Sequence, residues 1–172
     1  MRPLVPILAC LLLWSPRVSH GETVDKLVVA IEETLIFASD IRLEKALTER
    51  DISASPYWSP SHTNATERLI GAAIIKRLAA QVDLYEPSQA DLSTRLDALR
   101  TGFKNRQAWM SFLARHGLNE RDLKQVLRNR LMAERFLERN LEAPMEQTVL
   151  WLKQCDTLLM EASARLRIRR IP

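Results

Sequence analysis

The chain has 172 residues, of which 47% are hydrophobic and 27% are charged, and its formal net charge is +4. This length allows one domain, and the apolar content excludes a disordered chain. Only four residues are glycine and only 6% are aromatic, while Leu, Ala, Glu and Arg dominate, which favours a mainly α-helical fold over an all-β one.

The first 21 residues, MRPLVPILACLLLWSPRVSHG, have the pattern of a secretory signal peptide. Arg2 gives a positive start, and the apolar run Leu4–Trp14 is too short to span a bilayer. Small residues stand at the −3 and −1 positions of a cut before Glu22. The alternatives are a buried or membrane-anchoring N-terminal helix and a lipoprotein cut at Cys10.

Removal of this segment would leave residues 22–172 as one exported domain, without stable membrane insertion. It would carry 23 basic and 21 acidic residues, a net charge of +2. This balance argues against nucleic-acid binding, which needs a strong basic footprint. Cys155 would be the one remaining cysteine, and its apolar helical surroundings favour a buried thiol over a reactive one.

The domain begins with a predicted hairpin. The segment Val24–Ile31 is β-branched and apolar, Glu32–Thr34 can turn, and Leu35–Phe37 can return as a second strand. Ser39 then resembles a helix N-cap and opens an amphipathic helix that runs to about Arg50.

Residues 51–63, DISASPYWSPSHT, contain two prolines among small polar residues and therefore predict a loop. Tyr57 and Trp58 lie between the prolines. Two interpretations stay open: the loop folds back onto the core and buries both rings, or the rings form a contact patch for a partner.

Polar N-caps and glycine stops predict four further helices, at 64–83, 88–102, 105–116 and 119–141. A last helix follows Pro144 and runs to about Ala164. It is apolar almost all round, which is typical of a helix packed on several sides.

The long helix at 119–141 carries two apolar stripes. One repeats at core spacing, and Met132 and Phe136 form a second line displaced around the helix. Either neighbouring helices cover both stripes, or the second one serves a partner.

The chain ends in ARLRIRRIP, which alternates arginine with apolar residues as a half-exposed strand does. Leu166 and Ile168 would face inward. Because a lone strand leaves its backbone groups unpaired, this strand needs a partner, and the N-terminal hairpin offers the other strand signals. We therefore expect a mainly α, multi-helix domain with a small antiparallel sheet formed by the N-terminal hairpin and the C-terminal strand.

Four segments in this order resemble the N-terminal chaperone domain of SurA-type periplasmic folding factors: VDKLVVAIEETLIFASDI, RLIGAAIIKRLAAQ, ARHGLNERDLKQVLRNRLMAERFL and the amphipathic return strand. The resemblance covers residues 22–172. In the third segment the family's pattern is matched by Gly117, Leu118, Asp122, Leu123, Val126, Arg130 and, with a one-residue shift, Leu131.

In that family, parvulin isomerase modules stand between the long helix and the C-terminal segment. Here only Glu142-Ala143-Pro144 fills that place, so no isomerase site is carried over and we expect no enzyme. His62 and His116 are not spaced as metal ligands, and no nucleophile elbow or phosphate-binding loop occurs. No cofactor or metal is expected.

The sequence thus predicts an exported chaperone that holds unfolded or partly folded proteins through apolar contacts. The resemblance implies a periplasmic location and outer-membrane protein clients. The alternative is an exported helical adaptor or assembly factor with one dedicated partner, and a homodimer that exchanges its terminal arms stays open. The predicted peptide contacts are Tyr57, Trp58, Trp109, Met110, Met132 and Phe136.

Overall fold

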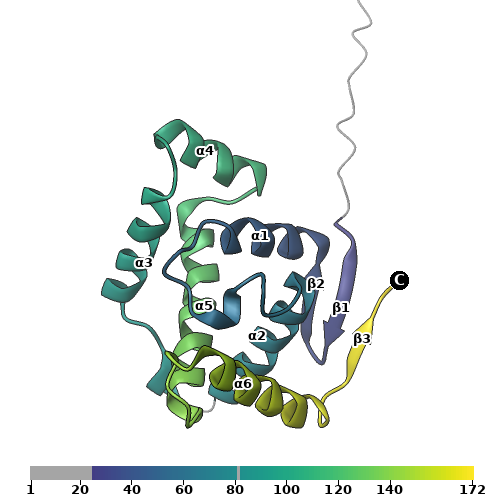
Figure 1. Cartoon of the computed structure of the whole chain (residues 1–172). Helices are drawn as coiled ribbons and strands as arrows, with labels where there is room; N and C mark the ends of the chain where they lie inside the picture. Colours follow the sequence, from purple (N-terminus) through teal and green to yellow (C-terminus); the bar gives the residue numbers. More distant parts are fainter. Residues whose placement is uncertain (1–24, 81) are drawn as a thin grey trace, which may run out of the picture.

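The computed structural model describes residues 25–80 and 82–172. The predicted signal peptide at residues 1–21 and the cut before Glu22 lie outside the described residues. Within the described ranges the chain forms six α-helices and three short strands, which confirms the mainly α fold with a small sheet (Figure 1).

The sheet joins the two ends of the domain. Its strands are β1 (Leu27–Ile31), β2 (Thr34–Phe37) and β3 (Ile168–Arg170), in the antiparallel order β2-β1-β3. Ile31 pairs with Thr34 on one side and with Ile168 on the other. The prediction that the C-terminal strand completes a sheet with the hairpin is confirmed.

The helices begin close to the predicted caps. Asn64, Ser88, Asn105 and Asn119 each accept a backbone N–H through the side chain at a helix start. The helices are α1 (Ala38–Thr48), α2 (Ala65–Ala79), α3 (Gln89–Thr101), α4 (Arg106–Arg115), α5 (Glu120–Asn140) and α6 (Thr148–Ser163).

Three predicted boundaries are corrected. Helix α1 starts after Phe37, whose N–H donates to Asp40 Oδ2 (2.8 Å), while the Ser39 hydroxyl donates to Asp25 instead of capping the helix. Helix α2 ends at Ala79, because a separate 3-10 turn forms at Asp83–Tyr85. Helix α6 starts at Thr148, because residues after Pro144 first make a turn.

Helix α5 runs through the middle of the domain and packs against α2 and α3, while α2 also contacts α1 and α6. Figure 1 shows α4 at the upper end, α6 at the lower end and the sheet at one side. The loop at 51–63 folds back through a 3-10 turn, Pro56–Trp58, which buries Tyr57 and Trp58. The first of the two interpretations of this loop is therefore the observed one.

Candidate functional site

Three arginines and three carboxylates form a buried ion network at the centre of the domain. They come from α1, the segment after it, α2, α3 and α5, so the network ties together elements far apart in the sequence. Because ions taken out of water lose several kcal/mol of hydration each, such groups must pair well. The members are Glu44, Asp51, Arg68, Arg95, Arg130 and Glu134.

Glu44 holds one half of the network. Its Oε1 accepts from Arg68 Nε (2.9 Å) and its Oε2 from Arg130 Nη1 (2.5 Å). Burial lowers the pKa of Arg130, and the charge of Glu44 opposes this shift. The Arg130 guanidinium also stacks over the Trp58 ring, 4.1 Å from its centroid. Glu44 thus fixes α2 and α5 against α1.

Arg95 holds the other half. Its Nε donates to Asp51 Oδ2 (3.0 Å) and its Nη2 to Glu134 Oε1 (2.8 Å). Burial raises the pKa of Glu134, which the positive charge of Arg95 opposes. The Ser55 N–H also donates to Glu134 (3.2 Å), so this half anchors the folded-back loop to α5.

An apolar groove of about 220 Å³ opens between β2, α1, α2 and α5, and we call it the β2 groove. Lys76 lies at its exposed part, and Glu44 and Arg130 of the ion network also line it. The buried ion network thus forms part of the wall of the groove. Its apolar lining includes Leu35, Ile36, Leu43, Leu69, Ala73 and Val126.

The β2 groove runs beside an edge of the sheet. The pairing of Ile31 with Thr34 across a two-residue turn directs the backbone N–H and C=O of Leu35 away from β1. The Leu35 side chain is 49% exposed. The other edge strand, β3, carries Arg169 and Arg170, and charges on an edge discourage the addition of another strand. The uncharged β2 is therefore the more receptive edge.

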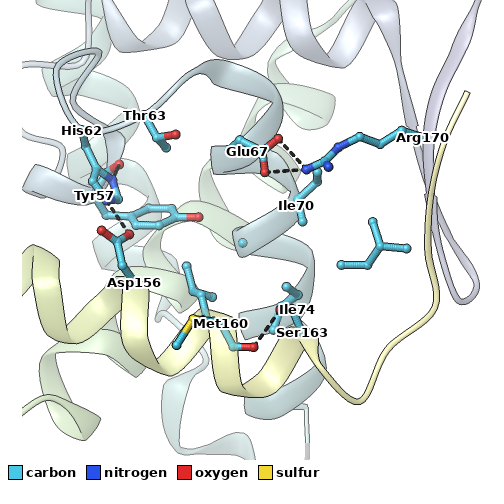
Figure 2. Close-up of a pocket in the computed structure, with 13 residues that line it drawn as sticks. Tyr57, His62, Thr63, Glu67, Ile70, Ile74, Asp156, Met160, Ser163 and Arg170 are labelled. Atoms are coloured by element: carbon cyan, nitrogen blue, oxygen red, sulfur yellow. Dashed lines mark hydrogen bonds and ion pairs between the residues drawn. The ribbon is translucent and has the colours of Figure 1, made fainter. Parts of the chain in front are cut away.

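A second hollow, of about 360 Å³, lies between the folded-back loop, α2, α6 and β3 (Figure 2). Its polar side chains pair with one another: His62 Nε2 lies 2.9 Å from Asp156 Oδ1, and Arg170 Nη2 donates to both Glu67 oxygens (2.7 and 3.0 Å). Figure 2 shows these pairs at opposite ends of the hollow. They connect α6 and β3 to the loop and α2, which is a structural role.

The structure places the six predicted peptide contacts in different parts of the domain. Tyr57, Trp109 and Phe136 are buried in the core, because the folded-back loop and neighbouring helices cover them. Met132 is half-buried against the same cluster as Phe136, so both stripes of α5 are covered.

The other two predicted contact residues lie apart from each other. Trp58 is also buried, but it lines the β2 groove. Met110 is 49% exposed and belongs to a different hollow beside α4. The structure thus does not gather the six into a single exposed patch, although Trp109 and Met110 line the same hollow.

Sequence reasoning missed the ion network, although α5 carries a signal for it. Arg130 and Glu134 stand at core spacing between Leu127 and Leu137, where a helix normally places apolar side chains. Charged residues at such positions indicate buried pairing, but their partners on other elements cannot be read from the same helix.

The thiol of Cys155 is predicted to be inert in the folded protein. Burial raises its pKa to about 12, so only about 10⁻⁴ of it is thiolate at pH 8. In a chain beginning at Glu22, which has no other cysteine, a colorimetric thiol reagent should react slowly in buffer and completely in denaturant. Rapid labelling in buffer, at the rate of a small free thiol, would contradict the burial.

No helix among the described residues is long and apolar enough to cross a membrane. In residues 25–80 and 82–172, no three His, Cys, Asp or Glu side chains gather as a metal site. Comparison of the chain with protein-family models, with curated protein sequences and with solved structures found no match.

Proposed function

We propose that the protein is an exported chaperone that binds unfolded polypeptide in the β2 groove by non-covalent contacts. The observation that carries the proposal is the apolar groove lying beside an uncharged edge strand. An extended chain can add to such an edge through its backbone, while its side chains enter the adjoining groove.

This mode of binding suits many clients. Backbone hydrogen bonds to Leu35 would be the same for any sequence, and an added strand turns every second side chain toward the same face. Apolar side chains that enter the groove gain about 25 cal/mol for each Å² removed from water. Binding would thus select segments in which apolar and polar residues alternate, and it would not depend on the rest of the client sequence.

Outer-membrane proteins fit this preference. Their strands alternate apolar and polar residues, so an unfolded segment offers one apolar side chain at every second position. The resemblance of residues 22–172 to SurA-type folding factors supports the same client class and a periplasmic location. Residues 141–147 lead directly from α5 to α6, at the place where that family carries its isomerase modules, so the proposed action is holding alone.

The test compares two changes at Leu35 with wild type, in a light-scattering assay of an unfolded outer-membrane barrel diluted from denaturant. Leu35→Asp puts a charge at the groove, and about tenfold more protein should be needed to suppress aggregation. Leu35→Pro removes the outward N–H but leaves pairing with β1 intact, and should weaken suppression too. Circular dichroism and urea unfolding would verify that both variants fold.

The matched control is Leu150→Asp, because Leu150 is 46% exposed and lies on α6 outside the groove. It should suppress aggregation as wild type does. Equal loss in the control and in Leu35→Asp would disprove the assigned site. If wild type protects none of several unrelated clients, the chaperone proposal fails, and an adaptor with one dedicated partner becomes the better description.

A further inference from the structure

Positive charge is concentrated at the α4 end of the domain. Residues 100–124 contain six basic and two acidic residues, a net charge of +4, whereas the whole of residues 22–172 has a net charge of +2. The remainder is therefore slightly acidic. The basic residues are Arg100, Lys104, Arg106, Arg115, Arg121 and Lys124.

Two of these residues, Arg100 and Arg106, line a hollow of about 470 Å³, which we call the α4 hollow, and Lys104 lies between the lining residues Phe103 and Asn105 in the chain. Phe103 and Trp109 line it in an edge-to-face pair with centroids 5.2 Å apart, and Met110 lines it with a side chain that is half exposed. Asn105 and Glu120 complete the lining on the polar side, together with the two arginines. The hollow thus offers an apolar wall with cations next to it.

The one carboxylate in the lining, Glu120, is already engaged. Its Oε1 accepts from Trp109 Nε1 (3.0 Å) and from Arg100 Nη2 (2.6 Å), and the Trp109 N–H followed by Arg100 holds its pKa below the usual value. Arg106 and Lys104 are exposed and have no carboxylate within ion-pair distance among the described residues. The uncompensated charge at the hollow is therefore positive.

We propose that the α4 hollow is a docking site for an acidic polypeptide segment that carries an aromatic or apolar side chain. Carboxylates of the segment would pair with Arg106 and Lys104, and the apolar side chain would lie against Phe103 and the flexible Met110. A polypeptide is favoured over a lipid surface because a concave hollow can accept a projecting side chain, whereas a bilayer presents a flat plane of headgroups.

This site is independent of the proposed chaperone function. The α4 hollow shares no lining residue with the β2 groove. Figure 1 shows α4 at the opposite end of the domain from α6, well away from the sheet. A client or a partner could therefore occupy the two sites separately.

The experiment measures binding of a fluorescent peptide, in which one phenylalanine is flanked by glutamates, to protein purified after export of the full chain. The peptide should bind at low salt, weaken as salt is added, and bind far better than the same peptide with lysines for glutamates. Arg106→Glu and Lys104→Glu should each weaken binding roughly tenfold. The control Lys153→Glu, an exposed change on α6, should not.

Other outcomes are decisive as well. Leu35→Asp should leave peptide binding unchanged even if it abolishes aggregation suppression, which separates the two proposals. Equal binding of the acidic and basic peptides, or full binding by Arg106→Glu, would overturn the docking site. Binding to vesicles of anionic phospholipid without binding to the acidic peptide would also overturn it, in favour of a membrane surface.

Discussion

Glu44→Gln is expected to lower the free energy of unfolding by about 3–5 kcal/mol. The carboxylate of Glu44 accepts from Arg68 and Arg130, and both arginines are buried. A neutral amide keeps the shape of the side chain but removes the negative charge between two guanidinium groups. Arg68 and Arg130 would then stay buried and positively charged without the carboxylate that lies between them. Removing one partner of a buried ion pair in this way is costly, because the remaining charge has lost its hydration and is no longer compensated.

The measurement is urea unfolding followed by circular dichroism, with midpoint and slope compared between variants. Glu49→Gln is the matched control, because Glu49 lies one turn further along, is exposed, and pairs only with the partly exposed Arg50 at 3.3 Å. That control should change stability by less than about 0.5 kcal/mol. A Glu44→Gln loss as small as the control's would show that the network does not hold the domain together.

Gly71→Ala is expected to destabilise the protein by about 1–3 kcal/mol, although this change in the interior of a helix ordinarily stabilises by roughly 1 kcal/mol. An added Cβ at position 71 would lie 2.1 Å from Tyr57 Oη and 2.9 Å from Leu159 Cδ1. The tyrosine cannot simply swing away, because its hydroxyl donates to the Arg68 carbonyl (2.7 Å) inside the core.

The companion variant is Tyr57→Phe, which removes the oxygen that the new methyl group would strike. In a protein that already carries Tyr57→Phe, Gly71→Ala should therefore destabilise by at least about 1 kcal/mol less than it does in wild type, as a double-mutant cycle in urea would show. If the two changes in the free energy of unfolding are strictly additive, the close approach of Tyr57 to α2 is not the reason why position 71 requires glycine.

The positions of strands and helices could be predicted because their signals are local. Side chains at Asn64, Ser88, Asn105 and Asn119 bond to the backbone within three residues, so each cap can be recognised without knowing the fold. The sequence predicts no strands other than the N-terminal hairpin and the C-terminal segment. The alternating pattern of the C-terminal segment was therefore enough to predict that it pairs with the hairpin.

The candidate site could be predicted much less well. Trp58 and Phe136 look equally suited to the surface and to the core, and only tertiary contacts bury them: Arg130 lies over the Trp58 ring, and Tyr85 packs edge-to-face against Phe136. The β2 groove is likewise formed by four elements, so no single stretch of sequence describes it.

The sequence by itself therefore determined the fold class, the starts of α2, α3, α4 and α5 and the closure of the sheet, since capping and alternation act over a few residues. Only the tertiary structure decided which apolar side chains are exposed and which charges are paired. Glu44 and Arg130 are 86 residues apart in the chain, and the balance between their hydration and their attraction is settled only when α1 and α5 meet.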